Sequence, residues 1–339
     1  MTLRIGLLST ASINRLLLGG ARAAEGVDVV AVASRDLARA RTHAAEHGIG
    51  RAHGSYDALL TDEDVDAVYV SLPNSLHAAW SIRALEAGKH VLCEKPLTRR
   101  PEDAEAAFVA AARAERMLAE AFMWRHHPQA RRLRELVAQR AVGELRLVRA
   151  AFAFDIFAMD RPGDVRLRRE LDGGGLMDVG CYCVSALRLL AGEPERVGGR
   201  QVVGPGGVDV RFAGTMSFPG GALGAFDCGL DMVAHHALEV VGDRGSILLS
   251  DPWHGRKPSI VLRRPGGDEA VAVPSANPYA CELEDFAAAV RGERPHPFGR
   301  ADAVGQARAI AALYRAAESG SDEAPRPRPP AAAGSLHEQ

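Results

Sequence analysis

Short apolar runs alternate with amphipathic segments over roughly the first 120 residues. Continuous runs rich in aliphatic side chains are typical of strands buried on both faces, and the segments between them have the Ala/Leu-rich composition of helices. Strands are expected at residues 3–8, 27–33, 65–70, 90–93 and 117–122, and helices at residues 13–25, 36–47, 77–87 and 101–115. Strand–helix alternation with short connections predicts parallel βαβ units and a doubly wound sheet.

The pattern changes after about Trp124, where a helix is expected at residues 128–140 and short apolar runs then follow between Gly/Pro/Asp turns. These runs predict a largely antiparallel sheet with strands at residues 145–154, 208–218, 222–228, 238–241, 246–249 and 259–263, and with helices at residues 171–191, 280–292 and 301–320. We therefore expect two domains, residues 1–123 and residues 124–320. Residues 321–339 are rich in Pro, Ala and Gly, which predicts a disordered tail.

Composition excludes several functional classes. Of the 339 residues, 47% are hydrophobic and 25% are charged, as in an ordinary globular protein, and the net charge of −2 argues against a nucleic-acid partner. The apolar runs are far shorter than the roughly 18 residues of a membrane span, and the first 20 residues lack the apolar core of a signal peptide. We expect a cytoplasmic protein with no membrane partner.

Cysteine, histidine and lysine usage narrows the candidate chemistry. The five cysteines form no Cys-x-x-Cys pair, and we expect reduced thiols. The histidines of His126-His127 and His235-His236 point apart on either a helix or a strand, so no metal site is expected. Only three lysines occur among 41 basic residues. Lys95 is one of them, and lysine, unlike arginine, can give up its proton.

The first strand runs into a turn where a dinucleotide-binding fold would carry Gly-x-Gly-x-x-Gly. Here Ser9, Ala11 and Asn14 occupy those positions, and the first two are small enough for a pyrophosphate to approach the helix N-terminus. An ordinary strand–helix turn capped by Ser12 is the alternative. From this turn we take as candidate cofactor-binding residues Gly6, Ser9, Thr10, Ala11, Ser12 and Ile13.

The end of the second strand bears on cofactor choice. Arg35 lies 35 − 14 = 21 positions past Asn14, about where a dinucleotide fold contacts the ribose. Ser34 and Arg35 offer a hydroxyl and a guanidinium, which suit a 2′-phosphate and favour NADP(H). NAD(H) stays possible, because Asp36 could turn to the ribose.

Several motifs, in this order and spacing, resemble one family. They lie at residues 71–77, 92–97 (with Glu94-Lys95-Pro96), 120–128, 173–182 and 279–292. They resemble the glucose–fructose oxidoreductase/inositol dehydrogenase/rhizopine-catabolism (Gfo/Idh/MocA) family of NAD(P)-dependent oxidoreductases. Ser9 and Ala11 in the first turn, and Tyr182 where the family often has histidine, are similar to the dihydrodiol/xylose dehydrogenase-like branch.

The resemblance implies an α/β protein with an N-terminal Rossmann domain and a C-terminal α/β domain with a large, mostly antiparallel open sheet. The outer face of that sheet often forms an oligomer interface, which implies a homodimer or homotetramer. It also implies that Lys95 stands beside the nicotinamide and the substrate oxygen, with a Lys95–Pro96 bond that is often cis.

Hydride transfer to or from a carbinol needs a proton moved at its oxygen. We assign Lys95 as polariser and proton relay, and expect desolvation and the nicotinamide charge to lower its pKa. Tyr182 is the expected proton donor or acceptor, made more acidic by the neighbouring ammonium. Asp178, four residues earlier on the same helix face, would orient the substrate hydroxyl or Lys95.

The remaining candidates follow from the same motifs. For the cofactor they are Leu72, Pro73, Asn74, His77, Glu94, Met123 and Arg125, together with Ser34, Arg35 and Lys95. Trp124 and Phe154 are candidates for the substrate pocket, alongside Lys95, Asp178 and Tyr182. A helix cap is the alternative role for Asn74, and a core aromatic for Phe154.

The expected function is NAD(P)-dependent hydride transfer at a secondary hydroxyl or carbonyl of a sugar or sugar-like cyclic diol. One alternative is a nucleotide-sugar ketoreductase, whose diphosphate could lie against the basic residues Arg161, Arg166, Arg168 and Arg169. The other is a non-catalytic dinucleotide-binding regulator, which should lack Lys95 or its partners.

Overall fold

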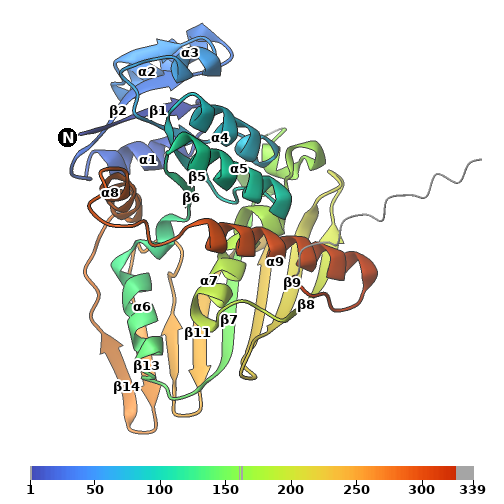
Figure 1. Cartoon of the computed structure of the whole chain (residues 1–339). Helices are drawn as coiled ribbons and strands as arrows, with labels where there is room; N and C mark the ends of the chain where they lie inside the picture. The colour runs from blue at the N-terminus through green and yellow to red at the C-terminus, as the bar shows by residue number, and fades with distance from the viewer. Residues whose placement is uncertain (1, 160, 162, 326–339) are drawn as a thin grey trace, which may run out of the picture.

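The N-terminal part of the computed structural model is built on a six-stranded parallel sheet (Figure 1). The structure describes residues 2–159, 161 and 163–325. The strands, in the order β3-β2-β1-β4-β5-β6, are β1 (Leu3–Leu8), β2 (Val27–Ala33), β3 (Arg51–His53), β4 (Ala67–Val70), β5 (His90–Glu94) and β6 (Leu118–Ala121). The order reverses between β1 and β4, which is where open parallel sheets bind ligands at the carboxyl ends of their strands.

Two helical layers enclose this sheet. The helices are α1 (Asn14–Ala21), α2 (Leu37–His47), α3 (Tyr56–Leu60), α4 (His77–Glu86) and α5 (Pro101–Ala114), joined by α8 (Pro278–Val290) and α9 (Arg300–Ser319) from the end of the chain. One core cluster joins the sheet to α1 and α8, and the other joins it to α4, α5 and α9. The expected doubly wound parallel sheet is confirmed.

The analysis of the sequence missed β3 and α3. β3 has three half-buried residues and no apolar run, so periodicity cannot reveal it. α3 has five residues, and its start depends on the Ser55 hydroxyl, which accepts a hydrogen bond from the Ala58 N–H at 3.1 Å.

The C-terminal part contains an eight-stranded sheet in the order β14-β13-β12-β11-β7-β10-β9-β8. Its strands are β7 (Leu145–Asp155), β8 (Arg196–Val203), β9 (Asp209–Ser217), β10 (Leu223–Gly229), β11 (Asp231–Gly242), β12 (Ser246–Leu249), β13 (Ile260–Arg264) and β14 (Gly267–Val271). β7 and β10 are parallel and the other pairs are antiparallel, so the expected mostly antiparallel sheet is confirmed. The edge strands β8 and β14 were not expected, because most of their side chains are exposed and give no apolar run.

Helices α6 (Pro128–Ala138) and α7 (Cys181–Ala191) cover the inner face of this sheet. In place of the expected single helix over residues 171–191, a short π-helix, η6 (Leu176–Gly180), precedes α7. One helical stretch of the described chain, Arg169–Ala191, is long and apolar enough to cross a membrane, and 78% of its apolar window is buried inside the protein.

The first residues of the expected tail are ordered. Glu323 pairs with Val197 of β8 through two main-chain hydrogen bonds of 2.7 and 2.8 Å. The expectation of disorder is therefore wrong for residues 321–325, because these few residues find backbone partners on an edge strand. Residues 326–339 lie outside the described part of the chain. The limits at residues 123 and 320 stay a prediction.

Candidate functional site

Lys95 and Asp178 meet between the two sheets. Lys95 follows β5 and Asp178 lies on η6, 83 residues later. The Lys95 ammonium donates hydrogen bonds to the main-chain oxygen of Asp178 at 2.7 Å and to its carboxylate at 3.3 Å. The Lys95–Pro96 peptide bond is cis, as the resemblance implied.

The glycine run before η6 allows the start of η6, the element that carries Asp178, to lie close to Asp209. Gly174 has φ +123°, and a Cβ there would lie 2.2 Å from the Asp209 carboxylate. That carboxylate accepts hydrogen bonds from the Leu176 N–H at 2.6 Å and from the Tyr314 hydroxyl at 2.8 Å. Glycine is needed here for close approach to a buried aspartate, which anchors the start of the turn that carries Asp178.

Tyr182, the third predicted catalytic residue, stands on the first turn of α7. Its ring centroid is 4.9 Å from the Lys95 ammonium. Phe122 and Phe152 pack edge-on against it, with centroids 5.5 and 5.2 Å away. The structure thus brings Lys95, Asp178 and Tyr182 together, although they come from β5, η6 and α7.

In the protein without a bound dinucleotide, the pKa values of Lys95 and Tyr182 shift in the direction opposite to the one expected. Burial disfavours the Lys95 charge, but the Asp178 carboxylate, assisted by Cys181 and Glu94, raises the pKa of Lys95 above its ordinary value. Burial, with Glu94 and other acidic groups adding to it, raises the pKa of Tyr182 well above its ordinary value. Near neutral pH the site therefore presents a charged ammonium and a neutral phenol.

Glu94 supports this site from the sheet side. The Tyr69 hydroxyl donates a hydrogen bond to the Glu94 carboxylate, which also accepts the Lys95 main-chain N–H at 3.2 Å. Burial raises the pKa of Glu94. Glu94 is therefore placed to hold the backbone of Lys95 in position.

Aromatic side chains form one wall of the site. Trp253 stacks on Phe152 with an interplanar angle of 9° and a centroid distance of 5.8 Å, and it lies 5.9 Å from the Tyr182 ring. Trp124 is 1% exposed and packs edge-on behind Trp253, so it supports the wall. Phe154 is partly exposed, with the Arg166 guanidinium 5.4 Å from its ring.

The first turn takes the backbone shape of a glycine loop without glycine. Ser9 has φ +146°, a region that favours glycine. Its hydroxyl hydrogen-bonds the Ser71 hydroxyl at 2.8 Å and main-chain oxygen at 2.9 Å, and it accepts the Ala11 N–H at 3.1 Å. Asn14 completes the network. Its side-chain N–H donates to the main-chain oxygen of Ser9, and its side-chain oxygen accepts from the Ser71 hydroxyl, both at 2.8 Å. These buried bonds stabilise the unusual backbone.

The N-terminus of α1 is suited to an anion. Its N-cap is Ile13, and within the described residues no side chain caps it, so Ser12 does not play the capping role of the alternative interpretation. Thr10 and Ala11 are partly exposed in the same turn, and Ser12 is exposed. The N–H groups of Asn14, Arg15 and Leu16 donate to the main-chain oxygens of Ala11, Ser12 and Ile13, which leaves the N–H groups of Ser12 and Ile13 without a partner within the described residues. Unpaired N–H groups at a helix start bind phosphate well. Gly6 has a different role, because a Cβ there would lie 2.8 Å from Leu59 and it serves the packing of β1.

A cleft of about 550 Å³ is lined by residues from both parts of the chain, including Arg35, Leu72, Pro73, Trp80 and Arg168. Arg35 is exposed and has no ion-pair partner within the described residues. Asp36 is the N-cap of α2 and accepts the Ala38 N–H at 2.8 Å, which ties it to the helix. Ser34 is buried behind Arg35.

Two residues that were predicted to contact the cofactor, His77 and Asn74, form hydrogen bonds within the protein. His77 is 1% exposed, and its ring nitrogens lie 2.9 Å from the Pro96 oxygen and 2.7 Å from the Leu72 oxygen, so it joins two loops. The Asn74 side chain donates to the Asp172 oxygen at 2.8 Å and ties η1 (Asn74–Leu76) to the second domain.

Met123 and Arg125, also predicted to contact the cofactor, are both buried, at 3% and 2% exposed. Arg125 donates to the Ser185 hydroxyl at 2.7 Å and forms an ion pair with Asp302 of α9. A charge buried this deeply needs such partners, so Arg125 serves the core between the domains.

Sequence reasoning missed Phe152 and Trp253, which stack beside Tyr182. Phe152 lies in the expected strand 145–154, but its neighbours Ala151 and Ala153 are also apolar, so alternation does not indicate which face of the sheet it occupies. Trp253 lies in a loop after β12, and nothing in the local pattern indicates its position.

Comparison with known proteins agrees with this geometry. Residues 5–122 match the model of an oxidoreductase family with an NAD-binding Rossmann fold, and residues 130–248 match the GFO/IDH/MocA C-terminal domain. The chain is 38% identical to D-xylose 1-dehydrogenase (NADP(+)) 2 of Haloferax volcanii over 93% of this chain and 98% of that protein. It is 35% identical to a trans-1,2-dihydrobenzene-1,2-diol dehydrogenase of Danio rerio, covering 77% and 78%.

Among solved structures, the 3-ketoreductase KijD10 from Actinomadura kijaniata, in complex with NADP and TDP-benzene, superposes with a TM-score of 0.86. The two are 32% identical over 93% of this chain and 98% of that one. With both domain models matched and relatives aligned over nearly their whole length, the chain belongs to the Gfo/Idh/MocA family of NAD(P)-binding oxidoreductases.

Proposed function

We propose that the protein is an NADP(H)-preferring enzyme that oxidises a secondary hydroxyl, or reduces the corresponding carbonyl, of a sugar or sugar-like cyclic diol. The observation that carries this proposal is the convergence of Lys95, Asp178 and Tyr182 beside an aromatic wall. The dinucleotide supplies or accepts the hydride when bound. The chain's own residues then have to hold the substrate oxygen and move its proton.

In this proposal Lys95 polarises the substrate oxygen, because its ammonium is held charged by Asp178. In reduction the neutral Tyr182 phenol donates its proton to that oxygen and becomes a phenolate, which solvent then reprotonates. In oxidation the steps run in reverse: Tyr182 first loses its proton to solvent, and the phenolate then accepts the proton of the substrate hydroxyl. Asp178 positions Lys95, and the buried Phe152 and Trp253 pack against the Tyr182 ring and hold it in place.

The residues fit a dinucleotide with a 2′-phosphate. The uncapped start of α1 and the glycine-like turn at Ser9 would hold the pyrophosphate. Arg35, exposed at the cleft and without an ion-pair partner within the described residues, would hold the 2′-phosphate, while Asp36 is engaged as a helix cap. The NADP in the KijD10 structure and the NADP(+) in the xylose dehydrogenase's name support the preference.

The nucleotide-sugar ketoreductase is the second candidate, favoured by the likeness to KijD10. The proposed basic groove does not favour it: Arg166 pairs with Asp164 at 2.7 Å, and Arg168 pairs with Glu170 at 2.6 Å. A non-catalytic regulator is disfavoured because Lys95, Asp178 and Tyr182 are all in contact.

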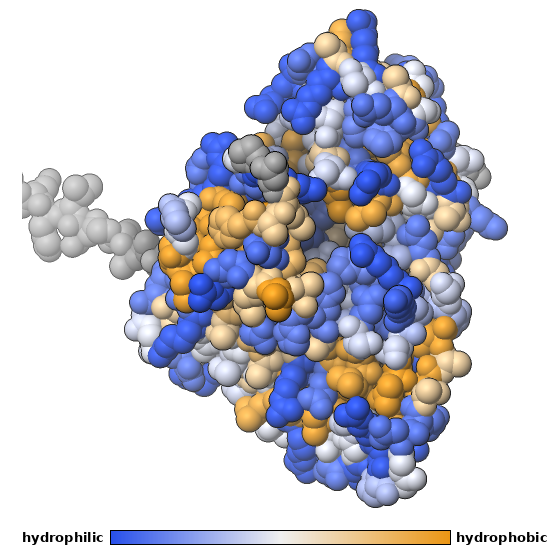
Figure 2. Space-filling model, turned by 180° about the vertical axis from the view of Figure 1, so that it is seen from behind, coloured by the Kyte–Doolittle hydropathy of each residue, from blue (hydrophilic) through white to orange (hydrophobic). Residues whose placement is uncertain are grey.

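We also expect a homodimer or homotetramer in the cytoplasm. A trough of about 790 Å³ on the outer face of the eight-stranded sheet is lined by small side chains such as Ala151, Ala213 and Ala225, against which a second sheet could pack closely. In Figure 2, which views the molecule from behind, apolar patches lie on the lower part that contains this sheet. All five cysteines are free thiols, as suits a reducing compartment. Light scattering of the purified protein measures the assembly.

The test of function is nicotinamide reduction by the purified protein with NADP⁺ or NAD⁺ and a panel of aldopyranoses, inositols and trans-dihydrodiols. Turnover that disappears in Lys95→Ala and persists in Lys257→Ala, a substitution of an exposed lysine, is the expected result. Turnover that survives in Lys95→Ala would contradict the assignment. Dinucleotide binding without turnover on any of these substrates would favour the nucleotide-sugar candidate.

A further inference from the structure

Two half-buried histidines and an aspartate converge next to the aromatic wall. The ligand atoms of His236, Asp251 and His254 all lie within 4.8 Å of one another. The Phe152 ring, which contacts Tyr182, also contacts both imidazoles, with centroids 4.8 Å from His236 and 5.7 Å from His254. We propose that these three residues form a binding site for a zinc-type divalent cation, a site that the hydride-transfer function does not require.

Strand register brings two of the ligands together. β11 and β12 pair antiparallel with Leu238 opposite Leu249. Continuing this register by two residues sets His236 opposite Asp251, just beyond the end of β12. Directly opposed residues on one face of an antiparallel pair have Cβ atoms about 4.5–5.5 Å apart. The pair therefore follows from the topology of the sheet.

The loop that carries Asp251 and His254 is held from several sides. The Gln129 amide donates to the Asp251 main-chain oxygen at 2.9 Å, and the Trp253 indole N–H donates to the Ala151 oxygen at 2.9 Å. Gly255 packs so closely on His127 that a Cβ would lie 2.8 Å from its ring. The position of His254 is thus determined by the residues on either side of it.

The carboxylate is oriented as a ligand requires. One oxygen of Asp251, Oδ2, accepts the main-chain N–H groups of Arg256 at 2.9 Å and Lys257 at 3.1 Å. The other oxygen, Oδ1, is therefore available as the ligand atom. Hydrogen bonds of this kind around a ligand fix its orientation, and their loss weakens metal sites.

Two imidazoles and one carboxylate are a known ligand set for zinc with an open fourth position. Bonds of about 2.0–2.2 Å place ligand atoms roughly 3–4 Å apart, so small side-chain rotations close the present cluster around an ion. The positive charges of Arg256 and Lys95 act on His254. The Asp251 carboxylate is needed to offset their repulsion of a cation, which makes it the most diagnostic position.

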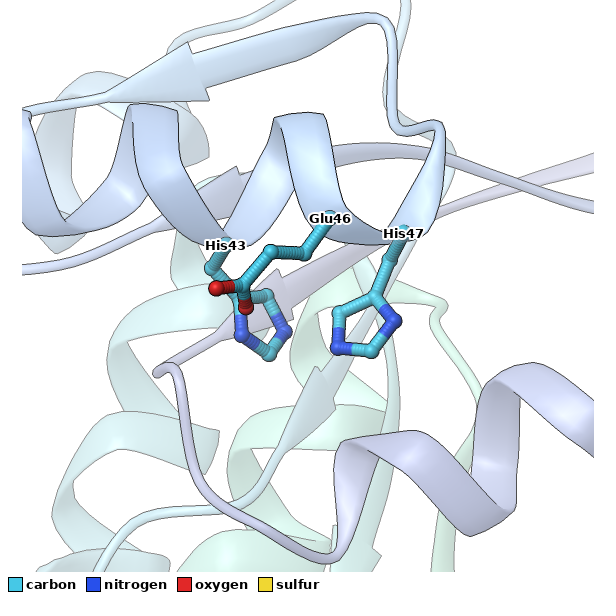
Figure 3. Close-up of side chains that lie close together, drawn as sticks. All are labelled: His43, Glu46 and His47. Carbon is cyan, nitrogen blue, oxygen red and sulfur yellow. The ribbon is translucent and has the colours of Figure 1, made fainter.

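A second group of potential metal ligands, His43, Glu46 and His47, would compete for added metal and has to be removed in the experiment. Figure 3 shows its three side chains leaving one side of α2, and the ring centroids are 4.5 Å apart. All three come from one helix, and Glu46 is exposed. Histidines four residues apart on a helix can bind added zinc weakly, so a His43→Ala/His47→Ala background removes this competitor.

The experiment titrates that background protein with Zn²⁺ against a chromophoric chelator, and then repeats it with His236→Ala, Asp251→Asn and His254→Ala. His235→Ala is the matched control, because the neighbouring His235 lines the outer face of the same strand. Far-ultraviolet circular dichroism and retained dinucleotide binding show that each variant is folded. The visible spectrum of bound Co²⁺ reports the coordination number.

We expect one Zn²⁺ per chain and a four-coordinate Co²⁺ spectrum. Each of the three ligand variants should lose at least about tenfold in affinity, while His235→Ala should retain it. Absence of binding in the background protein, or equal affinity in folded Asp251→Asn and His254→Ala variants, would overturn the proposal. Because the readout is metal affinity, its result is independent of whether a dehydrogenase substrate has been found.

Discussion

The ammonium of Lys95 donates a 2.7 Å hydrogen bond to the main-chain oxygen of Asp178 and lies 3.3 Å from one oxygen of the Asp178 carboxylate. This double contact joins the end of β5 to η6, and so one domain to the other. It also helps to keep the lysine charged, because Asp178, Cys181 and Glu94 together raise the pKa of Lys95 against the opposing effect of burial. The candidate reaction therefore begins from an ammonium.

Asp178→Asn separates these two contacts, since the asparagine keeps the main-chain oxygen and loses the negative charge. We expect the pKa of Lys95 to fall, because burial is then less opposed. The basic limb of the pH profile of kcat/KM should move to lower pH. Asp103→Asn, which removes a partner of Arg100 instead, should leave that limb in place. An unmoved limb in Asp178→Asn would show that Lys95 does not control the profile.

Tyr182→Phe removes the phenol oxygen and keeps the ring that packs on Phe122 and Phe152. We expect kcat to fall by on the order of 10²-fold or more, the usual effect of losing a general acid or base. The melting temperature and the affinity for NADP⁺ should change little. Steady-state kinetics measures kcat, a thermal melt measures the melting temperature, and a titration with NADP⁺ measures the affinity. A variant with full kcat would remove Tyr182 from the proton path.

Arg35→Ala tests cofactor choice. Hydrogen bonds to charged groups contribute about 1.5–3 kcal/mol, so affinity for NADP⁺ should fall roughly 10- to 100-fold while affinity for NAD⁺ stays the same. Arg39→Ala, an exposed arginine on α2, is the control. Fluorescence titration of both dinucleotides measures the ratio. An equal loss for NADP⁺ and NAD⁺ would mean that Arg35 does not contact the 2′-phosphate.

Glu120 provides a test of stability against pH. It is buried in β6, where one carboxylate oxygen accepts the Leu97 N–H at 2.7 Å and the other has no partner within the described residues. Burial raises the pKa of Glu120 to about 7. Because the folded-state pKa lies above the ordinary unfolded value near 4.5, its contribution to stability is complete below pH 4.5 and is lost as the pH rises through 7.

Glu120→Gln cannot ionise, so it should lack this loss. The free energy of unfolding of the wild type relative to Glu120→Gln should decline by about 3 kcal/mol between pH 4.5 and pH 8. Urea denaturation across that range measures it, with exposed Glu86→Gln as the control. Parallel curves for wild type and Glu120→Gln would mean that the Glu120 carboxyl has the same pKa in the folded and unfolded chains.

Local patterns in the sequence were enough to predict the strand and helix alternation, the change of sheet type after residue 124, and Lys95, Asp178 and Tyr182 as candidate catalytic residues. These follow from local periodicity and from motifs, which depend on residues close together in the chain. Local patterns could not reveal β3 or β8, whose short or exposed strands carry no apolar pattern.

Which polar groups come into contact became known from the folded structure. The Arg125–Asp302 ion pair spans 177 residues, and Arg125 is a residue that was predicted to contact the cofactor. His77 turned inward to two carbonyl oxygens, and His236 met Asp251 through strand register. The pKa of Lys95 is raised against the effect of burial because Asp178, 83 residues away, acts together with Cys181 and Glu94. Such pairings depend on long-range packing and on the balance of desolvation against charge, which a linear pattern does not contain.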